Sequence, residues 1–266
     1  MDILAYGFMQ RALIAGAMIA VTCSTIGVFL VLRRMSLMGD GLAHISFAGI
    51  AGGMFFKVYP LLSALAFTII SALGIQYLKR MKIYGDAAIA IFFSFGLALG
   101  VILISFARGF GTDLFSYLFG SILAVSETDL YFMAALCAVT IGVLLLFYKE
   151  LFYITFDEDS AEASGIPVEG LNTVLIVLTA IAVVVSMRVV GILLVASFLA
   201  LPASTALLIS KGFRDTMMLS ALIALVGSTL GLVAAFYLDI AAGGAIVMVL
   251  VCAFVCSLAY RKMIKG

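Results

Sequence analysis

Long apolar runs alternate with short charged segments along the whole chain, and this pattern limits the possible folds more than any other feature. Each run is close to the length of about 20 residues that a helix needs to cross the hydrocarbon core of a bilayer. The runs fall at about 12–32, 42–56, 60–78, 86–107, 130–148, 171–187, 189–210, 216–237 and 241–260. The second run is short and the break at Met187-Arg188 is weak, so eight and nine spans both remain open.

The balance of residue types favours the same class of protein. Hydrophobic residues make up 65% of the chain and charged residues only 11%, whereas a soluble domain carries roughly a quarter charged residues. The runs also lack the alternation that marks the strands of an outer-membrane barrel. We therefore predict an all-α, polytopic helical membrane protein in contact with membrane lipid, with residues 1–266 forming a single transmembrane domain.

The charged residues predict the orientation of the chain in the membrane and argue against nucleic acid as a partner. With nine spans and a cytoplasmic C-terminus, the cytoplasmic side holds eleven of the 15 Lys and Arg residues and the external side holds four. The positive-inside rule favours this arrangement, which places the N-terminus outside. Because 15 basic and 14 acidic residues nearly cancel, the chain offers no electrostatic basis for binding nucleic acid.

The only histidine, His44, follows Asp40 by four residues within an apolar stretch. On a helix these two positions share a face, so their side chains can meet. A buried imidazole held by a carboxylate for structural reasons is the plain alternative, but an ionisable pair inside a membrane span is costly and usually marks function. Nitrogen and oxygen donors together suit a divalent transition metal. We predict that Asp40 and His44 hold such an ion transiently, with a second copy of the chain or water completing its ligands.

A second polar stretch, 156–167, interrupts the apolar pattern in the longest predicted cytoplasmic loop. Asp or Ser caps, an Ala/Glu centre, then Gly165 and Pro167 predict a short helix of about two turns. A solvated connector is one interpretation, and a docking helix for a cytoplasmic partner is the other. The docking residues would be Asp157, Glu158, Asp159, Ser160, Glu162 and Gly165.

Two further features are less specific. The segment 108–129 is too apolar for a loop and too interrupted for a span, so an interfacial or re-entrant helix fits it, either as a structural element or as a gate. Pro202 lies inside a predicted span, where it permits a kink. The sequence contains neither a phosphate-binding P-loop nor a zinc-protease His-Glu-x-x-His motif. We therefore expect a transport subunit without an ATPase site of its own, not an enzyme.

These stretches together resemble the integral-membrane permease of zinc/manganese-type ATP-binding-cassette (ABC) importers. The resemblance opens at 8–13. Its most specific block is 27–44, which ends in Met38-Gly39-Asp40-Gly41-Leu42-Ala43-His44, and further matches follow in family order at 112–115, 118–125, 156–158, 191–196 and 201–206. The resemblance covers essentially the whole chain. It implies the ABC importer permease fold and a location in a bacterial plasma membrane.

The resemblance also implies partners and roles. Two such permease subunits, here expected to be identical, would surround a central pathway, with two ATPase subunits bound in the cytoplasm and an extracytoplasmic metal-binding protein delivering the ion. Asp40 and His44 correspond to residues that contact the metal, and the helix near 159–165 corresponds to the coupling helix that docks on the ATPase. No cofactor would be bound permanently, and Zn²⁺ or Mn²⁺ would be the cargo, with zinc slightly favoured because imidazole suits it.

Two rival functions use the same pair of residues. A stand-alone secondary carrier or channel would use Asp40 and His44 as a proton or ion relay and would need no ATPase. A membrane enzyme would instead use His44 as a base, and the isolated chain would then turn over some substrate.

Overall fold

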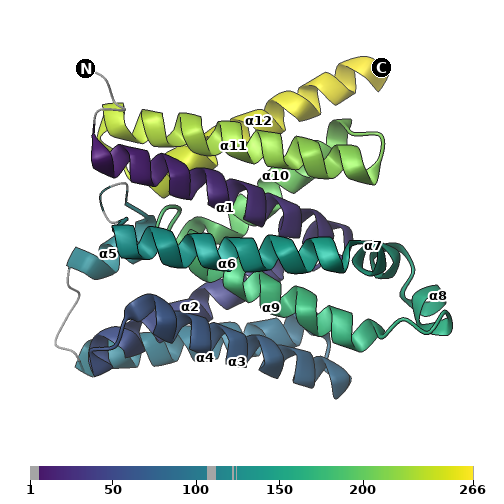
Figure 1. Cartoon of the computed structure of the whole chain (residues 1–266), viewed down its shortest axis with the longest axis horizontal. Coiled ribbons are helices and arrows are strands. Elements are labelled where there is room, and N and C mark those ends of the chain that lie inside the picture. The colour runs from purple at the N-terminus through teal and green to yellow at the C-terminus, as the bar shows by residue number, and fades with distance from the viewer. Residues whose placement is uncertain (1–5, 107–111, 122, 124, 266) are drawn as a thin grey trace.

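The computed structural model describes residues 6–106, 112–121, 123 and 125–265, and every regular element in this part of the chain is a helix (Figure 1). The all-α prediction is confirmed. In chain order the helices are α1 (Gly7–Leu32), α2 (Leu37–Phe56), α3 (Pro60–Arg80), α4 (Gly85–Phe106), α5 (Thr112–Phe119), α6 (Glu127–Leu146), α7 (Tyr148–Phe156), α8 (Glu158–Ala163), α9 (Val168–Ser186), the 3₁₀ helix η2 (Ile192–Leu194), α10 (Val195–Ile209), α11 (Phe213–Leu238) and α12 (Ala242–Lys265).

Within the described ranges, eight helical segments are long and apolar enough to cross a membrane, with η2 and α10 counted as one. Helix α2 is not among the eight, but its 20 residues would measure about 30 Å at 1.5 Å per residue. Figure 1 shows α2 beside α3 and α4, the start of α1 and the end of α12 at opposite ends of the bundle, and α8 on the side where α12 ends. Counting α2 as a ninth crossing gives this placement of the ends, since an odd number of passes puts the termini on opposite sides.

The two uncertain places in the span pattern have clear structural explanations. Helix α2 begins at Leu37, five residues before the apolar run that predicted it, because the polar Asp40 in its first turn interrupts the run. The weak break near Met187-Arg188 is a real one: α9 ends at Ser186, and Gly191 adopts a left-handed conformation with φ of 85° before η2 begins.

Pairs of glycines four residues apart bring the helices into close contact. A Cβ on Gly49 of α2 would lie 2.5 Å from Cα of Ala64 in α3, and one on Gly231 of α11 would lie 2.4 Å from Cα of Ile246 in α12. Real Cβ atoms do not approach a neighbouring backbone so closely, so only glycine fits at these positions. The same spacing is found in the pairs Gly49/Gly53, Gly96/Gly100 and Gly227/Gly231, each of which faces a neighbouring helix as small-residue packing in lipid predicts.

Candidate functional site

Asp40 and His44 meet on one face of α2, as their spacing predicts. The distance between His44 Nε2 and Asp40 Oδ1 is 3.8 Å, which is too long for a hydrogen bond between them. The His44 side chain is 15% exposed and the Asp40 side chain 43%. The imidazole is therefore held inside the bundle, while the carboxylate beside it reaches an open surface of this single chain.

Neighbouring helices hold the backbone and the ring of His44 in place. The ring of Phe93 in α4 packs against the imidazole, with 4.3 Å between ring centroids. A Cβ on Gly96, one turn further along α4, would lie 2.9 Å from the His44 carbonyl oxygen. On the other side, a Cβ on Gly39 would lie 2.8 Å from Leu199 Cδ1 in α10. Helix α2 is thus wedged between α4 and α10, and its polar face has little freedom to rotate.

The geometry of the pair suits a shared ion. Ligand atoms bound at 2.0–2.2 Å to a tetrahedral metal lie roughly 3.4 Å apart. The two donor atoms are 3.8 Å apart here, so a small rotation of either side chain would let one ion bind both. Within the described residues, no group of three or more His, Cys, Asp or Glu side chains could hold a metal. In a single chain, therefore, Asp40 and His44 supply only two of the ligands that a bound ion would need.

The short helix predicted between Asp157 and Gly165 is present as α8. The carboxylate of Asp157 accepts a hydrogen bond of 2.9 Å from the backbone of Ser160 and one of 2.5 Å from its hydroxyl. These hydrogen bonds hold the pKa of Asp157 below its ordinary value. After the helix, Gly165 adopts φ of 81°, and the amide of Ile166 donates to the Ala161 carbonyl at 3.1 Å, so both predicted ends are confirmed.

The side chains of α8 fall into two groups. Asp159, Ser160 and Glu162 are exposed, as are Asp157 and Gly165 at the ends of the helix. Glu158 is also partly exposed, but its carboxylate pairs with Arg33, which follows α1. A docking role for all six residues remains a prediction, and Glu158 differs from the others because it has a charged partner within the chain.

A polar cluster at the opposite end of the bundle is not predictable from the sequence patterns described above. Asp129 is 1% exposed; its carboxylate accepts a hydrogen bond from the Tyr59 hydroxyl and pairs with Arg188 at 3.2 Å. The Arg188 guanidinium lies 4.3 Å from the centroid of the Tyr117 ring. Burial and the bond to Asp129 raise the pKa of Tyr59. The available signal was a charged residue at the edge of an apolar run, which both Asp129 and Arg188 provide.

This cluster joins four segments of the chain. Tyr59 precedes α3, Tyr117 lies in α5, Asp129 is in the first turn of α6, and Arg188 lies between α9 and η2. The expected interfacial or re-entrant segment 108–129 therefore contains the short helix α5, which this cluster ties to the bundle. Residues 107–111, 122 and 124 of that segment lie outside the described residues.

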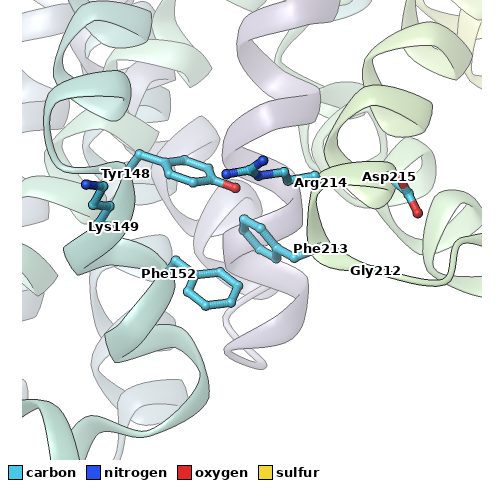
Figure 2. A pocket seen from close by; sticks show the side chains of 7 residues that line it. All are labelled: Tyr148, Lys149, Phe152, Gly212, Phe213, Arg214 and Asp215. Atoms are coloured by element: carbon cyan, nitrogen blue, oxygen red, sulfur yellow. The ribbon is translucent and has the colours of Figure 1, made fainter.

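A surface pocket of about 500 Å³ opens between α7 and the start of α11, as Figure 2 shows. Aromatic rings line it together with two cationic side chains; its residues are Tyr148, Lys149, Phe152, Gly212, Phe213, Arg214 and Asp215. Neither Asp40 nor His44 contributes to it, so this pocket is separate from the candidate metal pair.

Comparison with known proteins identifies the family. The sequence profile of the ABC 3 transport family matches residues 5–261. The chain belongs to the ABC 3 transport family. It is 37% identical to the manganese transport system membrane protein MntC of Listeria innocua, over 92% of this chain and 87% of that protein. It is also 30% identical to the high-affinity zinc uptake system membrane protein ZnuB of Haemophilus influenzae, over 94% of this chain and 97% of that one.

A solved structure agrees with this assignment. The structure described as PsaBC from Streptococcus pneumoniae in complex with Fab superposes with a TM-score of 0.86 at 36% sequence identity, and the match covers 95% of this chain and 91% of that one. This ABC 3 protein is accordingly a multi-pass membrane subunit of a bacterial ABC transporter for metal ions, with the permease fold that its sequence predicts.

Proposed function

We propose that this chain is the permease of an ABC importer that moves Zn²⁺ or Mn²⁺ into the cytoplasm, and that Asp40 and His44 contact the ion on its way. The observation that carries the proposal is the placement of these two donors 3.8 Å apart on a helix wedged inside the bundle. An ionisable pair in such a place lowers stability, and such pairs are therefore usually kept for a function such as transport. The names of relatives that carry manganese or zinc support the class of cargo.

A second copy of the chain completes the pathway in this proposal. Asp40 is 43% exposed, so its carboxylate can face the same residue of a partner across a two-fold axis. Two carboxylates and two imidazoles then surround the ion, and water can fill any remaining position. Such a ligand set is incomplete until both copies close on the ion, so it can release what it binds.

Energy comes from separate subunits in this proposal. An ATPase docks on the exposed face of α8 in the cytoplasm, and an extracytoplasmic metal-binding protein delivers the ion at the other end. The permease itself makes and breaks no covalent bond. Imidazole favours zinc, while carboxylate and water ligands favour manganese, so this pair accepts either ion.

The test is metal uptake by proteoliposomes that hold the chain alone or together with the ATPase from the same transport system. With the extracytoplasmic metal-binding protein supplying the ion from outside, the proposal predicts ATP-dependent accumulation of ⁶⁵Zn²⁺ or ⁵⁴Mn²⁺ only when both subunits are present. A stand-alone carrier or channel predicts uptake by the chain alone, driven by an ion gradient, and that outcome would contradict the proposal. Competition between the two isotopes then identifies the preferred ion.

A further inference from the structure

An ion pair joins α8 to the segment between α1 and α2. Nη2 of Arg33, directly after α1, contacts Oε1 of Glu158 in the first turn of α8. The Arg33 side chain is only 8% exposed, whereas Glu158 is 49% exposed. Asn172 of α9 donates a hydrogen bond of 3.4 Å to the same carboxylate oxygen. Glu158 therefore points from α8 back toward the membrane bundle.

Backbone hydrogen bonds restrain the segment that carries Arg33. The Arg33 amide donates to the Phe29 carbonyl at 3.0 Å, and the Met35 amide donates to the Leu30 carbonyl at 2.8 Å. Between them Arg34 adopts the left-handed conformation, with φ of 57°. The amide of Met38, inside α2, then donates to the Met35 carbonyl at 2.9 Å. These hydrogen bonds connect the segment that carries Arg33 directly to the first turn of α2, where Asp40 lies.

The charges around Arg33 make its partner necessary. Arg33, Lys79 and Glu158 line one cavity of about 330 Å³ at the junction of α7, α8 and the end of α3. Burial lowers the pKa of Arg33, which reflects the cost of holding a guanidinium there. Without the Glu158 carboxylate, two cations would face each other in a partly buried space. The charge of Arg33 is thus balanced while α8 keeps its present position.

Aromatic packing beside this junction fixes α7, from which α8 projects. The ring of Phe213 at the start of α11 lies 5.4 Å from Phe29 of α1, 4.9 Å from Phe152 and 6.0 Å from Phe156, measured between centroids. Figure 2 shows Phe213 and Phe152 facing each other across the gap between α7 and α11. Helix α7 is thus held by aromatic packing, and Glu158 is the side chain of α8 that contacts the α1–α2 segment.

We propose that Arg33 and Glu158 are positioning residues that transmit the movement of α8 to the start of α2, and so to Asp40 and His44. This inference rests on the proposed function, in which an ATPase docks on α8. It assigns Glu158 a role inside the permease, separate from the exposed side chains of the same helix. The pair acts on the metal site through the backbone of α2 and does not itself contact the ion.

The experiment compares variants of the permease–ATPase complex in proteoliposomes, with metal accumulation and ATP hydrolysis measured on the same sample. Glu158→Gln and Arg33→Gln should each lower the number of ions moved per ATP by about tenfold, while the ATPase stays bound and continues to hydrolyse ATP. The charge swap Arg33→Glu/Glu158→Arg should recover part of the loss, which a purely structural defect would not allow.

Arg80→Gln is the matched control, because Arg80 pairs with Glu169 at 3.2 Å on the exposed surface between α3 and α9. This variant should keep the wild-type ratio, since exposed ion pairs contribute little. The inference is overturned if Glu158→Gln keeps the wild-type ratio, if it detaches the ATPase, or if the swap works no better than the single variants. Absence of ATP-dependent uptake by the wild-type complex would instead refute the proposed function.

Discussion

Gly96 of α4 lies directly against the backbone of His44, so close that a Cβ on this glycine would stand 2.9 Å from the His44 carbonyl oxygen and 2.7 Å from Cα of Ile45. Gly96→Ala should push α4 away from α2 and shift the imidazole. We expect it to cost about 1–3 kcal/mol in stability and to reduce metal uptake more than it reduces the amount of folded complex. Radiolabelled uptake normalised to purified complex is the measurement.

Gly142→Ala is the control for that prediction. Gly142 lies within α6, and a Cβ there would meet no atom within 4 Å outside its own helix segment. Since alanine is the better helix former by about 1 kcal/mol, this variant should fold and transport at least as well as the wild type. Equal losses of uptake in both variants would show that close packing against His44 has no special importance.

Asp129 should contribute strongly to stability. Its buried carboxylate pairs with Arg188 and accepts the Tyr59 hydroxyl, so Asp129→Ala leaves the Arg188 charge without its acidic partner. Loss of one partner of a buried pair costs about 3–5 kcal/mol, whereas Tyr59→Phe removes one hydrogen bond and should cost about 1 kcal/mol. Thermal unfolding in detergent should therefore show a large fall in Tm for the first variant and a small one for the second.

The double variant Asp129→Ala/Arg188→Leu tests whether the unpaired Arg188 charge causes the fall in Tm of Asp129→Ala. Removing the uncompensated guanidinium should recover a large part of the Tm, because the buried charge is then absent. Strictly additive effects of the two substitutions would mean that the two residues do not stabilise each other.

The cap of α8 gives a prediction for pH. Hydrogen bonds from Ser160 lower the pKa of Asp157 in the folded chain, so the cap stabilises α8 above the unfolded-state pKa and is lost as the pH falls through the lower folded value. Because the unfolded value is about 3.9, the cap should stay intact from pH 8 to pH 5. Hydrogen exchange should show faster exchange of α8 amides in Asp157→Ala than in Asp157→Asn, which keeps an acceptor oxygen. Equal exchange in the two variants would contradict a capping role.

Replacing residues 159–162 with Gly and Ser tests the proposed docking role of α8. These positions include the exposed side chains of Asp159 and Glu162, and the change removes both the charges and the helix propensity while Glu158 and Asp157 stay in place. We expect ATP hydrolysis to become uncoupled from transport, or the ATPase to dissociate from purified complex. Full transport by an unchanged complex would rule out docking on this helix.

The sequence is sufficient to predict the spans other than α2 because each of those is a long apolar run, and lipid leaves the backbone few alternatives to a helix. The pair Asp40 and His44 is predictable for a similar reason, since a four-residue spacing on one helix fixes which side chains meet. The same local reasoning finds α8, whose cap and stop residues all lie within 156–167.

Contacts between distant segments could not be predicted in this way. Arg33 and Glu158 are 125 residues apart, and Tyr59 and Asp129 are 70 apart, so only the packing of the helices brings them together. The early start of α2 is unpredictable for a different reason: the Asp40 carboxylate in its first turn breaks the apolar run that marks a span.

In the proposed mechanism Asp40 and His44 together bind the ion during transport, and metal uptake by the His44→Ala complex is the decisive measurement. Proteoliposomes should contain the permease with its ATPase bound, with ATP sealed inside and the metal-binding protein outside, so that only complexes with an inward-facing ATPase accumulate ⁵⁴Mn²⁺ or ⁶⁵Zn²⁺. We predict that His44→Ala, like Asp40→Ala, assembles normally with the ATPase but accumulates neither ion above the level without ATP. Uptake of either ion at the wild-type rate by the His44→Ala complex would contradict the account.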